Sequence, residues 1–179
     1  RLQGYHWFDY GYMPHPVYTG TTTTAPVVTA SGPLSFCSGG NVTLTAPANA
    51  TYLWTNGMTT RTIVVSAGGN YSCSVTQNGT TQSSNVLSVS VNAMPSSSFA
   101  IGTAGASGVP LTSTSSAGSG SISSYRWYHD GASISGATNS SYMAIQDGSY
   151  TVQVTNSNGC SQLANAQSIT VPVVSCILT

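Results

Sequence analysis

The side chains that could act on a substrate or hold a metal are few in this chain. Its 179 residues include three histidines, three aspartates, three arginines and four cysteines, and no lysine or glutamate. His6, Asp9 and His15 lie close together in the sequence, but their spacing matches no closed zinc site and no facial triad on a defined element. We therefore expect no metal site and no bound cofactor.

Catalysis by side chains is not expected either. Hydrolysis of a glycoside needs two carboxyl groups at a fixed separation, whereas Asp130 and Asp147 both lie in Asp-Gly turns, where aspartate is favoured for backbone reasons. His129 is next to Asp130 in the same turn. Serines are numerous, but no Gly-x-Ser-x-Gly elbow or paired base accompanies any of them. The sequence predicts a protein that is not an enzyme.

The scarcity of charge excludes some partners and favours others. The formal net charge is zero, and charged residues make up 3% of the chain. Nucleic-acid binding draws its affinity from cationic groups, so a nucleic-acid partner is not expected. No apolar run is long enough to cross a bilayer, so no membrane span is expected. A neutral surface of Thr, Ser, Asn, Gln and Gly favours association over dispersion.

Two copies of one strand pattern organise most of the chain. A Tyr-x-Trp strand, at 52–54 and again at 125–127, is followed in each copy by a Gly-x-Tyr segment of alternating residues, at 69–76 and 148–155. Each copy then reaches an Asn-Gly turn and closes on another alternating strand. A period of two residues, with turn signals and no helical period, predicts an all-β chain of two tandem β-sandwiches.

Four aromatic residues of the repeats are candidates for the two cores. A tryptophan in the middle of a sheet fills the space between two layers. A tyrosine at the start of the penultimate strand can bury its ring while its hydroxyl bonds backbone at the corner. The candidates are Trp54 and Tyr71 in the first copy and Trp127 and Tyr150 in the second.

The two copies resemble bacterial immunoglobulin-like repeats of the type found in secreted and cell-surface proteins of Bacteroidota. The resemblance rests on residues 31–46 and 52–57 of the first copy and 127–138 of the second. It implies tandem immunoglobulin-like sandwiches, but such modules serve as spacers, adhesin repeats and enzyme appendages alike. The expected organisation is an N-terminal aromatic arm and Thr-rich linker (1–24), a first domain (25–93), a second domain (94–173) and a C-terminal tail (174–179).

The chain contains four cysteines and begins without a leader, as an exported and processed protein would. This context favours disulfides over metal ligands or free thiols. The preferred pair is Cys37 with Cys73, because both should lie near the same end of the first sandwich. A strand between Cys160 and Cys176 should carry the chain about 25 Å, too far for a bridge. The alternatives are a partner for Cys176 in another subunit, a Cys37–Cys160 bridge across the junction, or free thiols. The resemblance also allows Cys176 to begin a further repeat.

The N-terminal arm carries six aromatic side chains: Tyr5, Trp7, Phe8, Tyr10, Tyr12 and Tyr18. A free arm of this kind would expose more apolar surface than a solitary soluble protein tolerates. It either folds back on its own chain or adds to a sandwich of a neighbouring subunit, where strand addition gives affinity through backbone bonds. A head-to-tail contact that does not close into a ring generates a filament.

The sequence therefore predicts a structural subunit of an extracellular filament or surface adhesin, assembled from copies of itself through the arm and the sandwich edges. The absence of lysine fits edges that are meant to be occupied, because lysine commonly protects them. The alternative is a glycan-binding or spacer module of a larger secreted protein, in which Trp7, Tyr10 and Tyr12 would stack on sugar rings.

Overall fold

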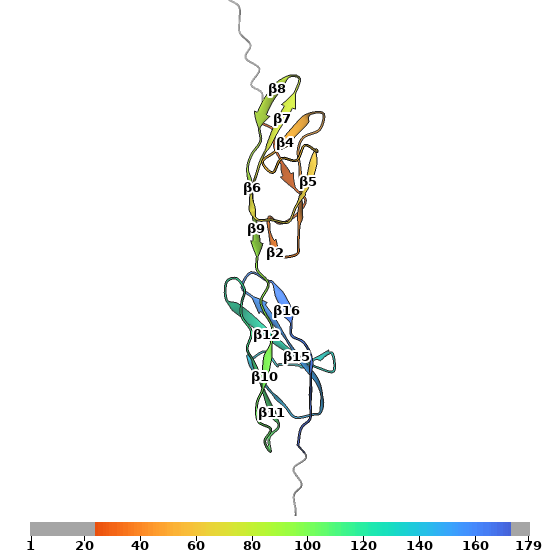
Figure 1. Cartoon of the computed structure of the whole chain (residues 1–179), viewed down its shortest axis with the longest axis vertical. Helices are drawn as coiled ribbons and strands as arrows, with labels where there is room; N and C mark the ends of the chain where they lie inside the picture. Colours follow the sequence, from red (N-terminus) through yellow and green to blue (C-terminus); the bar gives the residue numbers. More distant parts are fainter. Residues whose placement is uncertain (1–23, 173–179) are drawn as a thin grey trace, which may run out of the picture.

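The computed structural model describes residues 24–172. The six aromatic residues of the arm, the His6, Asp9 and His15 group, and Cys176 lie outside the described residues. Residues 24–172 contain seventeen strands and no helix, so the prediction of an all-β chain is confirmed. The strands form two β-sandwiches that lie end to end along the long axis of the molecule (Figure 1).

The first sandwich contains nine short strands. They are β1 (Thr29–Ala30), β2 (Ser35–Cys37), β3 (Val42–Thr45), β4 (Thr51–Trp54), β5 (Thr62–Val65), β6 (Gly69–Tyr71), β7 (Cys73–Gln77), β8 (Thr80–Ser83) and β9 (Leu87–Asn92). Their pairing gives three small sheets, in the orders β1-β3-β5, β2-β9-β6 and β4-β7-β8. All neighbours are antiparallel except β2 and β9, which run parallel.

The second sandwich contains eight strands. They are β10 (Phe99–Ile101), β11 (Val109–Ser113), β12 (Ile122–His129), β13 (Ala132–Ser133), β14 (Ser141–Ala144), β15 (Gly148–Asn156), β16 (Ser161–Leu163) and β17 (Gln167–Ile169). One sheet has the order β10-β11-β14, and the other has the order β13-β12-β15-β16 with β17 also pairing β15. The long strands β12 and β15 form the centre of the larger sheet.

Alternating strands bury one face each, which gives every sandwich its own apolar core. In β3 the side chains of Val42 and Leu44 are buried, and in β15 those of Val152 and Val154 are buried. Two separate clusters result, one formed by residues of the first sandwich and one by residues of the second. Hydrophobic burial of this kind is the main stabilising term for each sandwich.

The repeated aromatic residues occupy matching places in the two cores. Trp54 and Trp127 are 2% and 0% exposed, and the indole N–H of each donates to a backbone carbonyl, at Thr60 and Asn139. Tyr150 is 1% exposed, whereas Tyr71 is only partly buried. The tryptophan and the tyrosine occur at the same points of the repeated pattern, so the two cores are built from equivalent residues.

Each repeated tyrosine also makes the corner hydrogen bond that its position predicts. The Tyr150 hydroxyl donates to the Gln146 carbonyl at 3.0 Å, and the Tyr71 hydroxyl donates to the Ala67 carbonyl at the same distance. Burial, followed by the nearby Tyr142 hydroxyl and by two aspartates, raises the pKa of Tyr150. The neutral, donating form of the hydroxyl is therefore the one that the second sandwich stabilises.

Candidate functional site: the junction between the sandwiches

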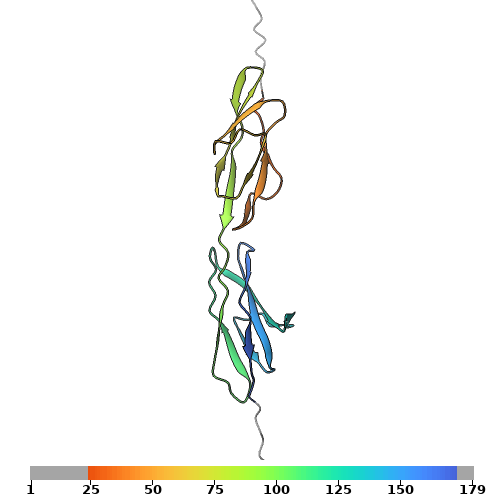
Figure 2. The same cartoon turned by 45° about the vertical axis from the view of Figure 1, so that its right-hand side comes forward.

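The place where the two sandwiches meet is the most elaborate polar site in the described part of the chain. Figure 1 and Figure 2, which differ by a rotation of 45°, both show the sandwiches stacked end to end and connected by the segment between β9 and β10. This linker comprises residues 93–98. The end of β2, the linker and the turn between β15 and β16 come together at this point.

A disulfide between Cys37 and Cys160 joins the two sandwiches covalently, with the two Cα atoms 5.6 Å apart. Cys37 ends β2 and lies opposite Asn92, the last residue of β9 before the linker. Cys160 lies in the turn before β16 and is 1% exposed. The bridge therefore runs beside the linker, as a second connection between the sandwiches.

The preferred pairing of Cys37 with Cys73 is wrong, and the alternative bridge across the junction is correct. Cys73 begins β7, opposite Trp54 of β4, and its side chain faces the core of the first sandwich with 0% exposure. Cys37 lies at the end of the sandwich that meets its neighbour. Position along the strand, rather than membership of one sandwich, decides which cysteines meet.

The buried side chain of Asn156 holds the linker against the second sandwich. Its side chain is 1% exposed, and its amide nitrogen donates to the carbonyl of Ala93 at 3.1 Å and to that of Ala117 at 2.9 Å. Its amide oxygen accepts from the backbone N–H groups of Asn158 and Cys160, at 3.1 and 3.0 Å. One side chain thus satisfies four backbone groups drawn from the linker, a neighbouring loop and the disulfide turn.

The linker makes further contacts with the loop that precedes β12. Ser96 pairs with Ser116 through two backbone hydrogen bonds of 3.0 and 3.1 Å, and their hydroxyls lie 2.9 Å apart. The hydroxyl of Ser119 donates to the carbonyl of Ala93 at 3.3 Å. Pro95, between these contacts, is buried. The linker therefore packs against the second sandwich.

Gly118 allows the loop and the linker to approach each other closely. Its φ is 68°, a left-handed conformation that side chains disfavour, and a Cβ at this position would collide with the carbonyl of Met94. No other residue type fits this space without moving the linker backbone. This contact could not be predicted from the sequence, because Gly118 lies in a Ser- and Gly-rich segment that is typical of any loop.

Gly118→Ala is expected to lower the free energy of unfolding of the second sandwich by about 2 to 4 kcal/mol. The positive φ accounts for about 1 to 2 kcal/mol of this loss, and the collision with the linker accounts for the rest. Gly136→Ala is the matched control, because Gly136 has a φ of 74° and nothing within 4 Å of an added Cβ. Urea unfolding followed by tryptophan fluorescence measures both. Equal losses would contradict the close contact.

The outer end of the first sandwich carries the turn that matches the disulfide turn of the second. By the repeat, Gln77 matches Asn156 and Thr80 matches Cys160, and Gln77 pairs with Thr80 across the turn. Both residues are exposed. They line a hollow of about 580 Å³ whose wall also includes residues 24–27. The two copies therefore differ at the turn that, in the second copy, carries Asn156 and the disulfide.

Cys73 is a free thiol buried in the first core. Burial raises the pKa of this thiol, against a smaller lowering by a backbone hydrogen bond at Leu53. The thiol is thus neutral in the folded protein. Its contribution to the free energy of unfolding is complete below the pKa of the thiol in the unfolded chain, and it is lost as the pH rises through the pKa in the folded protein. In the second copy, Val152 occupies the matching position. Cys73 acts as a small apolar residue rather than as a reactive group.

Cys73→Val is expected to change the free energy of unfolding of the first sandwich by less than about 1 kcal/mol, because it reproduces the second copy's residue with little change in volume. Cys73→Ser is expected to cost about 1 to 3 kcal/mol, because it buries a more polar hydroxyl in the core, where the Cys73 thiol makes one long contact of 3.6 Å to the Ser74 carbonyl. Thermal unfolding at neutral pH compares the two variants. A serine variant as stable as the valine variant would show that this site is not apolar.

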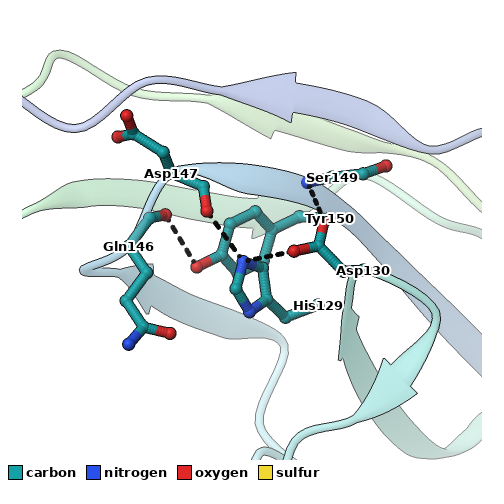
Figure 3. Close-up of polar contacts among 6 residues, drawn as sticks. All are labelled: His129, Asp130, Gln146, Asp147, Ser149 and Tyr150. Atoms are coloured by element: carbon teal, nitrogen blue, oxygen red, sulfur yellow. Dashed lines mark hydrogen bonds and ion pairs between the residues drawn. The ribbon is translucent and has the colours of Figure 1, made fainter.

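A second polar cluster lies where β12 ends and β15 begins and includes His129, Asp130 and Asp147 (Figure 3). The Nε2 atom of His129 lies 2.9 Å from the carbonyl oxygen of Asp147 and 3.4 Å from Oδ2 of Asp130. Both neighbours of this nitrogen are acceptors, so it carries the proton. The His129 ring stacks on Tyr150, with the ring centroids 4.6 Å apart.

The carboxyl groups of this cluster accept hydrogen bonds from backbone N–H groups. Asp130 Oδ1 accepts from the N–H of Ser149 at 2.8 Å, and Asp147 Oδ1 accepts from the N–H of Val171 at 2.7 Å. The cluster thus ties two turns and the last described segment to one another. These carboxyl groups position loops. Among residues 24–172, no three or more His, Cys, Asp or Glu residues gather as a metal site would require.

Comparisons with known proteins concern the fold. No protein-family model matches the chain, and no curated protein sequence matches it. The crystal structure of the N-terminal eight Ig domains of Down Syndrome Cell Adhesion Molecule, isoform 1.30.30, superposes with a TM-score of 0.58 at 17% identity, over 82% of this chain and 27% of that one. The fold is immunoglobulin-like. The prediction of two tandem immunoglobulin-like sandwiches is confirmed.

Weaker likeness extends to other β-sandwich modules. Fibronectin(III)-like modules of CbhA from Clostridium thermocellum match with a TM-score of 0.44 at 18% identity, over 79% of this chain and 91% of that one. The chain spans about a quarter of the length of the immunoglobulin-domain array above. No helix within residues 24–172 has the length and apolar character to span a membrane.

Proposed function

We propose that the chain is a non-enzymatic structural subunit of an extracellular filament or surface adhesin. The observation that carries this proposal is the locked junction, in which a disulfide, a buried asparagine and a packed linker hold two sandwiches in one line. A fixed end-to-end arrangement suits a spacer or a fibre segment, which must keep its two ends apart. The disulfide also fits an oxidising compartment outside the cytosol.

Head-to-tail assembly of copies of this chain is part of the proposal. Residue 24 lies at one end of the molecule and residue 172 lies at the other (Figure 1), which suits a contact along the axis. Residues 24–27, which follow the arm in the sequence, line the hollow around Gln77 and Thr80. The near absence of charge removes the repulsion that would keep copies apart. Such a heterologous contact gives a filament where it does not close.

Electron microscopy of the full chain beside a chain lacking residues 1–20 tests the assembly proposal. We expect regular fibres from the full chain and dispersed particles from the shortened one, because the aromatic residues of the arm provide the contact. Circular dichroism of the shortened chain should show an unchanged β-sheet spectrum, which separates loss of assembly from loss of fold. Dispersed particles in both samples would contradict the filament.

A glycan-binding or spacer module is the second candidate, and the outward face of the sandwiches favours it. A row of three hydroxyls crosses three neighbouring strands at the same place in both copies. The rows are Thr51, Thr76 and Thr81, and Ser124, Thr155 and Ser161. Within each row the last two hydroxyls lie 2.7 or 2.8 Å apart. Binding on a glycan array that survives removal of the arm would support this face as the site.

The bacterial, Bacteroidota-type origin suggested by the sequence resemblance belongs to the same proposal. Tandem immunoglobulin-like repeats of that kind are found in exported proteins, and the repeated Tyr-x-Trp strands carry the resemblance in this chain. An export test in a bacterial host, with the bridge assayed in the secreted product, addresses both localisation and disulfide formation. Retention of a reduced chain in the cytosol would contradict an extracellular role.

A further inference from the structure

We infer that the Cys37–Cys160 bridge gives this protein a mechanical function, because it carries end-to-end tension past both sandwich cores. The described chain enters at one end of the molecule and leaves at the opposite end, as both views show (Figures 1 and 2). Tension on an extended protein of this kind acts along the line that joins its two ends. The question is which covalent bonds lie on that line.

The shortest covalent path through the described residues uses only two short segments. It runs from residue 24 to Cys37, crosses the disulfide, and continues from Cys160 to residue 172. The bridged residues are 123 positions apart in the sequence. Strands β3 to β15 therefore all lie inside a closed covalent loop that tension cannot lengthen. The linker lies inside the same loop and is relieved of load.

The loop contains most of both cores. All the buried apolar residues of the two sandwiches lie between Cys37 and Cys160, apart from Val28, Ala164 and Ile169, and Cys160 itself closes the loop. Unfolding of the core residues inside the loop thus adds no length to a chain held at its ends. An unbridged tandem repeat behaves differently, because each core that unfolds releases its whole sequence.

The segments that do carry load are held by strand pairing. On one side β1 pairs with β3, and β2 lies parallel to β9. On the other side β16 and β17 both pair with β15. Detaching these strands would straighten the two segments to a combined reach of under about 100 Å, at about 3.5 Å per residue. This reach is the limit of extension for the described chain while the bridge is intact.

This inference goes beyond assembly, because it holds for a single chain whether or not copies associate. In a filament or an adhesin, however, it would let a subunit bear tension without opening its cores. The chemistry requires only the bond already present, and no further oxidant or reductant takes part. The load path is a consequence of which two positions are bridged: a pairing inside one sandwich, such as Cys37 with Cys73, would leave the other sandwich and the linker under tension.

Single-molecule stretching of the full chain, held by peptide tags at its two termini, tests the load path. The comparison is with Cys37→Ser/Cys160→Thr, which removes the bridge and places at 160 the residue that the first copy carries as Thr80. We expect the variant to release about 400 Å more contour length than the wild-type chain, for the 123 positions spanned by the bridge. Cys73→Val removes a cysteine that takes no part in the bridge, so this variant should extend like the wild-type chain.

The wild-type chain provides a test that does not depend on the variant folding. At forces that straighten the polypeptide, its contour length should fall short of that of a fully extended 179-residue chain by about 400 Å. A wild-type chain that reaches the full length before any covalent bond breaks would overturn the inference. Two wild-type unfolding steps, each releasing a whole sandwich, would overturn it equally.

Discussion

A chain carrying Cys37→Ser and Cys160→Thr is expected to lose up to about 5 kcal/mol of its free energy of unfolding, the loop-entropy value for a closed loop of this length. The bridge spans 123 positions, so it restricts the unfolded chain over most of its length. Threonine at 160 is the residue type that the first copy carries in the matching turn as Thr80. Guanidinium unfolding of the oxidised wild type and the variant gives the difference.

The same variant should also uncouple the two sandwiches. Each has its own apolar cluster, so without the bridge the two cores can unfold at different temperatures. With the bridge, unfolding of one sandwich remains tied to the other through the closed loop. Calorimetry should resolve two transitions in the variant and a more cooperative profile in the wild type and in Cys73→Val. Identical profiles at identical temperatures would show that the bridge constrains neither sandwich.

Asn156→Ala is expected to lower the free energy of unfolding of the second sandwich by about 3 to 4 kcal/mol. The substitution removes the acceptor of the Asn158 and Cys160 N–H groups. It also removes one of two donors to the carbonyls of Ala93 and Ala117, which keep the hydroxyl and the N–H of Ser119. Groups of this kind in a buried site bear the full cost of lost hydration. Urea unfolding followed by tryptophan fluorescence measures the loss.

Asn158→Ala is the matched control for that experiment. Asn158 is an exposed asparagine two positions away, and its side chain donates to the Ser119 hydroxyl at the surface. Its removal should cost about 0.5 kcal/mol or less, as for other surface changes. A loss at Asn156 no larger than that at Asn158 would mean that the linker is held by other contacts, and the assigned role of Asn156 would be wrong.

The fold could be predicted from the sequence because its signals are local and occur twice. The Tyr-x-Trp strands place Trp54 and Trp127 in equivalent core positions, and the Gly-x-Tyr segments place Tyr71 and Tyr150 at equivalent corners. A period of two residues is set by the strand itself, so it survives in any sequence that buries one face. These features need no knowledge of how one sandwich meets the next.

The junction could not be predicted in the same way, because it depends on how two copies stack. Asn156 and Gln77 occupy matching positions, but only Asn156 is buried, since the linker covers it. The residues next to Cys37 in the sequence do not indicate that its disulfide partner lies in the other sandwich. The cysteine in the Asn-Gly turn at 160, where the first copy has Thr80, was the one signal available. It favours a contact made by the second copy alone.

The most direct test of the account is the distance between one exposed residue of each sandwich, measured as a distribution by pulsed electron paramagnetic resonance. Val64 and Ile145 are each 66% exposed and can carry spin labels on non-natural amino acids, which leaves the cysteines untouched. A locked junction predicts one narrow distribution for the wild type and a broad one for Cys37→Ser/Cys160→Thr. An equally broad distribution in both would contradict a fixed arrangement of the sandwiches, and with it the structural role proposed for this chain.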